Sequence, residues 1–390
     1  MADKMAKKKG DEQSKKTAGI YTPYDLVPGG GERYLLTFAE YLASENYEVF
    51  LVLDEIYSRL RLKQMERELD ISLDNVRITA YSEAQNMKTF DVFVAMGNSL
   101  VPFVPPLGNF NIYICQFPFP QEEENIYKNS KYLTQYQKVI VYSDFVLANY
   151  KKLLKRYSLP DIPAEVVYPP CVLESGVKCI RKPGDKILIL TVGRFFTEGH
   201  CKRQDFLIEA FIKMLSLNPK LNNVELHIAG SIHPTKDGRD YFSKLNEMAN
   251  EHRHNIFLYG NIDANALKKL YADSHIYWHA AGVNVNPAEH PEMLEHFGIT
   301  VVEAMASGCI PVVINKGGPA EIVRTGIDGF CFNTQGELIE HTLSIINKIN
   351  DVKKKEDWTN LSKNSINRAM EYTKEMFYEK IGTILKKRNN

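Results

Sequence analysis

Two glutamates at a fixed spacing are the most specific chemical signal in the sequence. Glu295 and Glu303 are separated by seven residues in the segment EMLEHFGITVVEAMASGCIPVV, which begins at Glu292 and ends at Val313. Ionised carboxylates accept hydrogen bonds, so both side chains suit a ligand that presents hydroxyl groups. A carboxylate near a helix start also compensates the helix dipole without binding anything. The full string, which continues into GGPAEIV at 317–323, favours a ligand site over that alternative.

A helix is expected to begin at Gly298, between the two glutamates. Glu303 then falls within the first turns of this helix, which is predicted over Gly298–Ala306. The backbone N–H groups of Phe297, Gly298 and Ile299 would face outward from the helix start, where the partial positive charge of the helix favours phosphate. The segment therefore predicts an anion site beside the two carboxylates.

Two cations follow another buried strand. Arg194 comes shortly after the apolar run Ile187–Val192, and Lys202 lies in the loop that follows it. A pair of cations at the carboxyl end of a strand can bind a diphosphate and neutralise it as it departs. Taken alone, the two residues would be interpreted as solvated surface cations.

A glycine-rich turn, PGGGERYLL at 28–36, follows the first predicted strand and opens a helix. Gly30 and Gly31 let the backbone approach a ligand closely. The turn fails as a dinucleotide fingerprint because Tyr34 stands where G-x-G-x-x-G requires glycine, although Asp54 mimics the acidic ribose contact of a dehydrogenase. A tight turn without a ligand and a nicotinamide-dependent dehydrogenase are the alternatives for this segment.

The sequence offers no recognisable metal site. It contains no D-x-D triplet and no G-x-x-x-x-G-K-[ST] loop, and its six cysteines stand singly, without C-x-x-C spacing. Zinc, a disulfide framework and a P-loop NTPase are therefore not expected, and the cysteines favour a reducing compartment. The histidines at 275, 279, 290 and 296 are not interpreted as metal ligands: core or hydrogen-bonding roles are favoured for the first two, and His296 belongs to the segment of the two glutamates.

Short apolar runs alternate with amphipathic segments along most of the 390 residues, which is typical of parallel sheets covered by helices on both faces. The expected strands of the first half are Ala18–Thr22, Tyr47–Leu53, Asp91–Met96, Asn111–Cys115 and Val139–Tyr142, with helices at Gly31–Ala43 and Arg59–Leu69. Those of the second half are Ile187–Val192, Val224–Ala229, Ile256–Tyr259, His275–His279 and Ile310–Ile314, with helices that include Gln204–Leu217, Asp263–Ala272 and Gly298–Ala306. The alternation predicts two Rossmann-like, doubly wound α/β domains that face each other across a cleft.

The expected domain boundaries follow from the breaks in this alternation. A disordered, basic tail at 1–16 precedes an N-terminal domain at 17–170, and the non-periodic, turn-rich stretch 171–185 is interpreted as a linker. A C-terminal domain follows at 186–373, and the helical end at 374–390 is expected to return to the N-terminal domain. Lysine plus arginine (48) balances aspartate plus glutamate (48), so no nucleic-acid partner is expected.

The combination of VGRF, Lys202, E-H-F-G-x-x-x-x-E-A-M-A-x-G and GGPAEIV resembles the retaining family 4 glycosyltransferases of the GT-B fold. The resemblance covers roughly residues 17–390 and is strongest over 187–333. Within that class it is similar to bacterial enzymes of polysaccharide and lipid-linked oligosaccharide synthesis. It implies a nucleotide-diphosphate-sugar donor, bound mainly by the C-terminal domain, with no cofactor and no metal ion.

The resemblance also implies a role for each site residue. The diphosphate is bound by Arg194 and Lys202, and the ribose hydroxyls are bound by Glu303. The donor sugar and the distal phosphate are held by Glu295 and by the backbone amides of Phe297, Gly298 and Ile299. The turn at Gly30–Gly31 closes over the phosphates from the other domain, and the loop around Asn261 and Ile262 lies near the base.

The N-terminal domain lacks a histidine that many members of this family carry near the anomeric carbon. All ten histidines stand at or beyond His200, and Gln116 takes the corresponding place in ICQFPFPQ at 114–121. Glutamine can bind a hydroxyl but cannot serve as a general base near neutral pH. Either the departing phosphate takes the proton of the acceptor, which we favour because the donor motifs are intact, or the chain is impaired in catalysis.

The acceptor is expected to be a hydroxyl group of a glycan or lipid-linked glycan, in the synthesis of cell-surface polysaccharide or glycoconjugate. The apolar, aromatic segment 101–120 could line an acceptor groove or rest on a membrane surface, and loop packing over the sheet explains it equally well. The basic end KKRNN suits either anionic lipid or a solvated helix end. The expected location is the cytoplasm, with the inner face of a membrane as an option. A catalytically silent donor-binding subunit and a GT-B-like sugar-nucleotide epimerase are the alternatives to a transferase.

Overall fold

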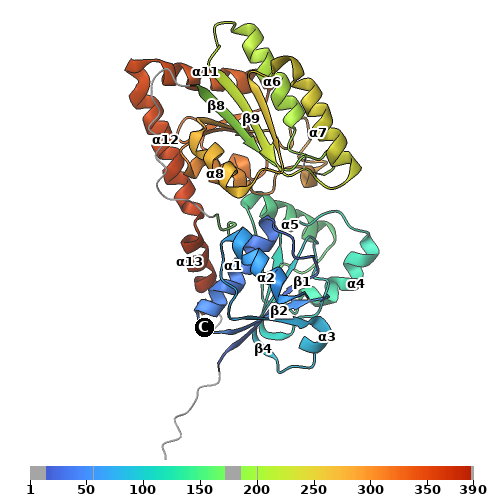
Figure 1. Ribbon diagram of the computed structural model, residues 1–390. Helices are drawn as coiled ribbons and strands as arrows, with labels where there is room; N and C mark the ends of the chain where they lie inside the picture. The colour runs from blue at the N-terminus through green and yellow to red at the C-terminus, as the bar shows by residue number, and fades with distance from the viewer. Residues whose placement is uncertain (1–14, 56, 172–185, 200, 388–390) are drawn as a thin grey trace, which may run out of the picture.

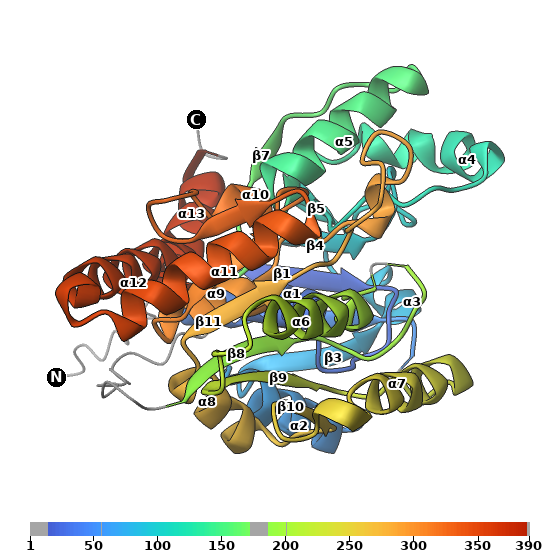
Figure 2. The ribbon, with the colours of Figure 1, turned by 90° about the horizontal axis from the view of Figure 1, so that it is seen from above.

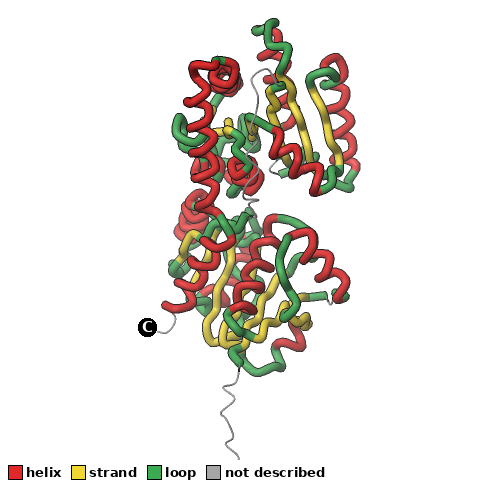
Figure 3. Tube along the Cα trace, turned by 60° about the vertical axis from the view of Figure 1, so that its left-hand side comes forward, coloured by secondary structure: helices red, strands yellow, loops and turns green. Residues whose placement is uncertain are grey.

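The computed structural model describes residues 15–55, 57–171, 186–199 and 201–387. Within these residues the chain forms two α/β domains, stacked one above the other in Figure 1, each built on one parallel sheet. Figure 3 shows the strands inside each domain and the helices around them. Nearly all of the predicted tail and of the predicted linker lies outside the described residues.

The described N-terminal domain contains a seven-stranded parallel sheet in the order β3-β2-β1-β4-β5-β6-β7. Its strands are β1 (Thr17–Thr22), β2 (Glu48–Leu53), β3 (Val76–Ala80), β4 (Phe90–Gly97), β5 (Gly108–Cys115), β6 (Lys138–Val141) and β7 (Ala164–Val166). Its helices are α1 (Gly30–Ser44), α2 (Arg59–Leu69), α3 (Tyr81–Ala84), α4 (Glu123–Leu133) and α5 (Asp144–Arg156). The order reverses between β1 and β4, and in such sheets ligands bind at the carboxyl ends of the strands near this point.

The described C-terminal domain contains a six-stranded parallel sheet in the order β10-β9-β8-β11-β12-β13. Its strands are β8 (Ile187–Val192), β9 (Val224–Gly230), β10 (Ile256–Gly260), β11 (Ile276–His279), β12 (Ile310–Ile314) and β13 (Phe330–Phe332). Its helices are α6 (Gln204–Leu217), α7 (Lys236–Met248), α8 (Ala264–Asp273), α9 (Ile299–Ala306), α10 (Pro319–Ile322), α11 (Gln335–Asn350) and α12 (Lys355–Ala369), and α13 (Lys374–Lys386) follows them at the end of the chain. Short 3₁₀ turns lie at Asn250–His252, Pro291–Met293, Val352–Lys354 and Met370–Tyr372.

The C-terminal end of the chain packs against the N-terminal domain. Helix α13 lies against α1, and α12 lies against α9 of the C-terminal domain. Phe377 of α13 meets Tyr34 of α1 edge to face, with ring centroids 4.9 Å apart, and Ile381 and Ile384 join the same buried core. Figures 1 and 2 show both helices along one side of the molecule. The last two helices therefore bridge the domains.

A carboxylate of the C-terminal domain caps a helix of the N-terminal domain. Glu321 of α10 accepts hydrogen bonds from the backbone N–H groups of Asp144, at 3.0 Å, and Phe145, at the start of α5. Next to this contact, the Ser143 hydroxyl donates to the backbone carbonyl of His296 at 2.7 Å. The helix start supplies positive partial charge, so a carboxylate is the appropriate partner. These contacts tie the loop that carries His296 to the opposite domain.

Glu321→Gln is expected to become more stable, relative to the wild-type chain, as the pH rises from about 5 to about 8. Burial, with the charge of Asp144, raises the pKa of Glu321 from 4.5 to about 7, so the folded chain binds this proton more tightly than the unfolded chain. That stabilisation is complete below the unfolded pKa and is lost as the pH passes the folded one, whereas glutamine does not titrate. For a half-buried group, the free energy of unfolding of Glu321→Gln relative to the wild type should rise by about 1–2 kcal/mol over this pH range. Urea unfolding of both proteins across this pH range measures it, and a difference independent of pH would contradict the assignment.

Candidate active site

A cavity of about 890 Å³ lies between the two domains. Its N-terminal wall is formed by the glycine turn, α1 and the end of α2, and its C-terminal wall by α8 and α9. The lining residues are Pro28, Gly29, Gly30, Arg33, Arg67, Glu68, Leu69, Asp70, Ala264, Leu267, Lys268, Tyr271, Ala272, Ile299, Thr300, Glu303, Ala306 and Ser307. Glu303 therefore lies in a cleft between the domains, and its role in binding a ligand stays a prediction.

The glycine turn touches the start of α9 across this cleft. A Cβ atom on Gly30 would lie 2.9 Å from Ile299 Cδ1, and one on Gly31 would lie 2.6 Å from Gln116 Nε2. Gly298, the N-cap of α9, has a φ of 117°, which residues other than glycine rarely adopt. The backbone geometry thus favours glycine at Gly298, whereas a side chain at Gly30 or Gly31 would displace the ends of the Ile299 and Gln116 side chains. The turn, Gln116 and the predicted helix start come together at one place.

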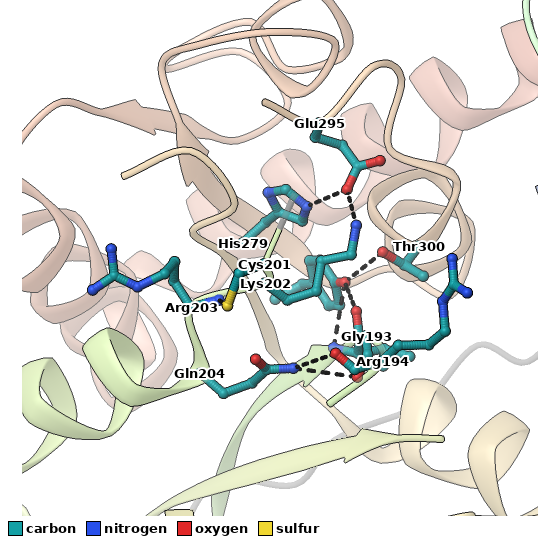
Figure 4. A network of polar contacts seen from close by, with 11 residues as sticks. Gly193, Arg194, Cys201, Lys202, Arg203, Gln204, His279, Glu295 and Thr300 are labelled. Atoms are coloured by element: carbon teal, nitrogen blue, oxygen red, sulfur yellow. Dashed lines mark hydrogen bonds and ion pairs between the residues drawn. The ribbon is translucent and has the colours of Figure 1, made fainter. Parts of the chain in front are cut away.

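Lys202 and Glu295 meet at the carboxyl ends of the C-terminal strands. The Lys202 ammonium forms an ion pair with Glu295 Oε2, and the two side chains are only 16% and 17% exposed. His279, the last residue of β11, places its Nε2 3.3 Å from the same oxygen, as Figure 4 shows. Burial lowers the pKa of His279 despite the neighbouring carboxylate, so its imidazole is neutral at pH 7. The site therefore combines one cation, one carboxylate and one neutral imidazole.

Gln204 supports the loop that carries both predicted cations. It is fully buried at the start of α6, and its Nε2 donates to the backbone carbonyls of Gly193, at 3.2 Å, and Arg194, at 3.3 Å. Gly193 leaves room for the Lys202 stem, because a Cβ atom there would lie 2.5 Å from Lys202 Cγ. The ends of this loop are thus fixed by buried contacts.

The Arg194 guanidinium extends away from the Lys202 amine (Figure 4). It is exposed and lies 5.6 Å from the centre of the Phe196 ring. Its charge also acts on Glu32 at the start of α1: burial raises the pKa of Glu32, and Arg194 partly offsets that rise. The structure thus places the two predicted diphosphate ligands on one loop, with their charged groups pointing in different directions.

Glu303 is bound by a tyrosine and faced by an arginine. The Tyr271 hydroxyl donates to Glu303 Oε2 at 3.0 Å. Burial raises the pKa of Glu303, while Arg33 and the Tyr271 hydrogen bond act in the opposite direction. Arg33 belongs to α1 of the other domain and donates to the Leu69 carbonyl at 3.4 Å. Neither Arg33 nor Tyr271 was predicted as a site residue, although Arg33 stands two residues after the glycine turn and could have been suspected.

Two polar side chains singled out in the sequence take part in local structure. Asn261 Oδ1 accepts from the Ile232 backbone N–H at 2.8 Å, and neither Asn261 nor Ile262 is among the described residues that line the cavity. A role of this loop near the base stays a prediction. Asp54, the residue of the dehydrogenase alternative, accepts a hydrogen bond from the Tyr21 hydroxyl at 3.1 Å.

The described part of the chain bears on metal binding and on membrane insertion. No group of three or more His, Cys, Asp or Glu side chains there is arranged to hold a metal ion. No described helix combines the length and the apolar character needed to cross a membrane.

The two facing Rossmann-like domains define the GT-B fold, and solved structures of this class resemble the chain over nearly its whole length. The glycosyltransferase from Rickettsia africae superposes with a TM-score of 0.69 at 16% identity, over 96% of this chain and 98% of that one. Anabaena HepE in complex with UDP superposes with a TM-score of 0.66 at 15% identity, over 95% and 100%. The predicted fold class is therefore confirmed.

Residues 177–368, the greater part of the C-terminal domain, match the family described as Glycosyl transferases group 1. An uncharacterized glycosyltransferase of Methanocaldococcus jannaschii is 30% identical over 196 residues, which are 47% of this chain and 44% of that protein. The GDP-Man:Man(3)GlcNAc(2)-PP-Dol alpha-1,2-mannosyltransferase of Dictyostelium discoideum is 30% identical over 46% of this chain and 35% of that protein. The chain thus spans less than half the length of these relatives. The family resemblance predicted from the motifs is confirmed.

Proposed function

We propose that this chain is a retaining glycosyltransferase that moves a sugar from a nucleotide-diphosphate-sugar to a hydroxyl group of a glycan or glycolipid. The observation that carries the proposal is the ion pair of Lys202 with Glu295, which stands three residues before the N-cap of α9, the helix whose Glu303 lines the cavity between the domains. A cation and a helix start suit a diphosphate, and carboxylates suit the hydroxyls of a sugar and a ribose. The match of residues 177–368 to the glycosyl transferase family supports the same activity.

In the proposed reaction, the bond between the anomeric carbon and the donor phosphate oxygen breaks while the acceptor oxygen bonds to the same face of that carbon. The acceptor proton passes to the departing phosphate oxygen, because glutamine at position 116 is no general base near neutral pH. Lys202, Arg194 and the α9 amides stabilise the charge that develops on the diphosphate. Glu303 binds the ribose, and Glu295 binds the donor sugar.

The acceptor is proposed to be a glycan or lipid-linked glycan, in the synthesis of cell-surface polysaccharide or glycoconjugate. The name of the Dictyostelium relative describes transfer of mannose to a glycan on dolichyl diphosphate, which supports a lipid-linked class of acceptor. A lipid-linked acceptor would bring the chain to the cytoplasmic face of a membrane as a peripheral protein.

Screening nucleotide-sugars for hydrolysis and thermal shift tests the proposal. A true donor should raise the melting temperature by mass action and should be hydrolysed slowly without an acceptor. Binding without hydrolysis, and without transfer to any glycan, would favour the silent donor-binding subunit suggested by Gln116. Conversion of the donor into another nucleotide-sugar would favour the epimerase. With an acceptor in hand, proton NMR of the first product tests retention, and an inverted anomer would contradict it.

Chelation by EDTA is expected to leave the transfer rate unchanged. The sequence has no D-x-D triplet, and the proposed diphosphate partners already carry positive charge. The rate is measured before and after EDTA, and again after Mg²⁺ or Mn²⁺ is added back in excess. Complete loss of the transfer rate that is reversed by the added metal would count against binding of the diphosphate by Lys202, Arg194 and the α9 amides alone.

A further inference from the structure

His279 lies where it can influence Glu295 without reaching into the cleft. It ends β11, which pairs with β8 and β12 inside the sheet, and its side chain is 3% exposed. Its Nε2 is 3.3 Å from Glu295 Oε2, the oxygen that also pairs with Lys202. Figure 4 shows both interactions converging on that oxygen. Glu295 is thus shared between a lysine and a histidine.

The surroundings of His279 determine which of its nitrogens carries the proton. Burial lowers the pKa of the imidazole, and the charge of Lys202 lowers it further, whereas Glu295 raises it by less. The imidazole is therefore neutral. Its Nδ1 is buried and has no hydrogen-bond partner among the described residues. A proton on Nδ1 would leave a buried donor unsatisfied and set a nitrogen lone pair against the carboxylate. The proton therefore belongs on Nε2, which donates to Glu295.

The Lys202–Glu295 ion pair must loosen when a donor binds, and the hydrogen bond from His279 can then keep Glu295 in place. If Lys202 binds the diphosphate of a donor, it must give up at least part of its contact with Glu295. Both side chains are more than four-fifths buried, and a buried carboxylate that loses its partner is costly unless another donor remains. The His279 N–H does not depend on Lys202 and stays with the carboxylate.

We propose that His279 is a positioning residue whose Nε2–H holds Glu295 in place while Lys202 turns from the carboxylate to the diphosphate of the donor. This inference rests on the proposed function, because it assumes that Lys202 and Glu295 act on a nucleotide-diphosphate-sugar. In this proposal His279 affects the reaction by orienting Glu295 and does not contact the donor.

The kinetic test compares His279→Leu, His279→Gln and Glu295→Ala, alone and combined. His279→Leu should lower kcat by about 10–100-fold with a much smaller change in donor KM, since it removes one hydrogen bond to a charged group. Glutamine can donate from a similar position and should restore part of the rate. In the Glu295→Ala background, His279→Leu should have little further effect, because residues that act through one another are not additive. His275→Leu is the matched control: His275 is 4% exposed, directly precedes the same strand, and accepts from the Leu188 N–H at 3.2 Å.

A second measurement does not depend on turnover. Nitrogen-15 NMR of histidine-labelled protein should show His279 as the neutral Nε2–H tautomer, with a shift that changes in Glu295→Ala. An Nδ1–H tautomer or a charged imidazolium at pH 7 would overturn the inference. So would equal losses of activity in His279→Leu and His275→Leu, or additive losses with Glu295→Ala. A wild-type chain that binds no nucleotide-sugar would instead overturn the proposed function, whatever the tautomer.

Discussion

Lys202→Ala is expected to lower kcat by about 10²–10³-fold and to change donor KM much less. The Lys202 side chain is only 16% exposed and is paired with Glu295 before a donor arrives. Its ammonium therefore lies close to the proposed diphosphate site and has only to turn from the carboxylate to meet the charge that grows on the leaving group. An interaction that is stronger in the transition state than in the ground state appears in kcat when it is removed, whereas uniform binding appears mainly in KM. Steady-state kinetics with a working donor and acceptor measure both constants.

Three companion variants make this test specific. Lys202→Arg should recover only part of the rate, because a planar guanidinium does not reproduce a compact ammonium. Gln116→Ala should be milder than Lys202→Ala, since glutamine is not expected to move a proton. Lys213→Ala removes an exposed lysine of α6 and should have no effect on kcat. If Gln116→Ala abolished turnover while Lys202→Ala barely changed it, the chemistry would depend on the loop that carries Gln116 and not on the cations that bind the diphosphate.

The fold could be predicted wherever a strand is buried on both faces. Every strand and helix predicted by range between residues 18 and 314 is present, with ends within three residues of the prediction. Asp263 caps α8 by accepting from two backbone N–H groups at 3.0 Å. The strands β3, β7 and β13 were missed. All three lie at sheet edges, where one side has no neighbour: β3 buries only Val76 and Thr79, and β7 buries no residue fully. Such strands need no apolar run, so hydrophobicity does not reveal them.

Only those residues of the candidate site that stand together in one continuous segment could be predicted. Lys202, Glu295 and Glu303 stand in recognisable strings, and the structure brings the first two into contact. Their supporting residues come from other elements: Tyr271 from α8 and Arg33 from α1 of the opposite domain. Contacts between residues so distant in sequence depend on the packing of helices and strands, which spacing along the chain does not encode. The direction of the Arg194 side chain could not be predicted either, because an exposed arginine has many rotamers of similar energy.

Glu303→Ala is expected to weaken the binding of a nucleoside diphosphate by about 10–150-fold, the equivalent of about 1.5–3 kcal/mol for hydrogen bonds to a charged acceptor. In the proposed complex the two ribose hydroxyls donate to this carboxylate. The Tyr271 hydroxyl already donates to Oε2 at 3.0 Å and orients the group before the ligand enters. Calorimetry measures the affinity directly, without an acceptor or turnover. Glu303→Gln keeps one acceptor oxygen without the charge, so its loss should be smaller than that of alanine.

The matched control for this variant is Glu68→Ala, because Glu68 lines the same cavity from α2 of the opposite domain. Its removal should leave the affinity almost unchanged if the ribose lies on α9. The pH dependence gives an independent check. Burial raises the pKa of Glu303 and Arg33 partly offsets that rise, so in the wild type the ionised acceptor is lost as the pH falls through that raised value. Affinity should therefore decline toward acid pH in the wild type, and this part of the decline should be missing in Glu303→Ala. An alanine variant with unchanged affinity, or with the same pH profile as the wild type, would remove Glu303 from the donor site and shift attention to the loop after β10.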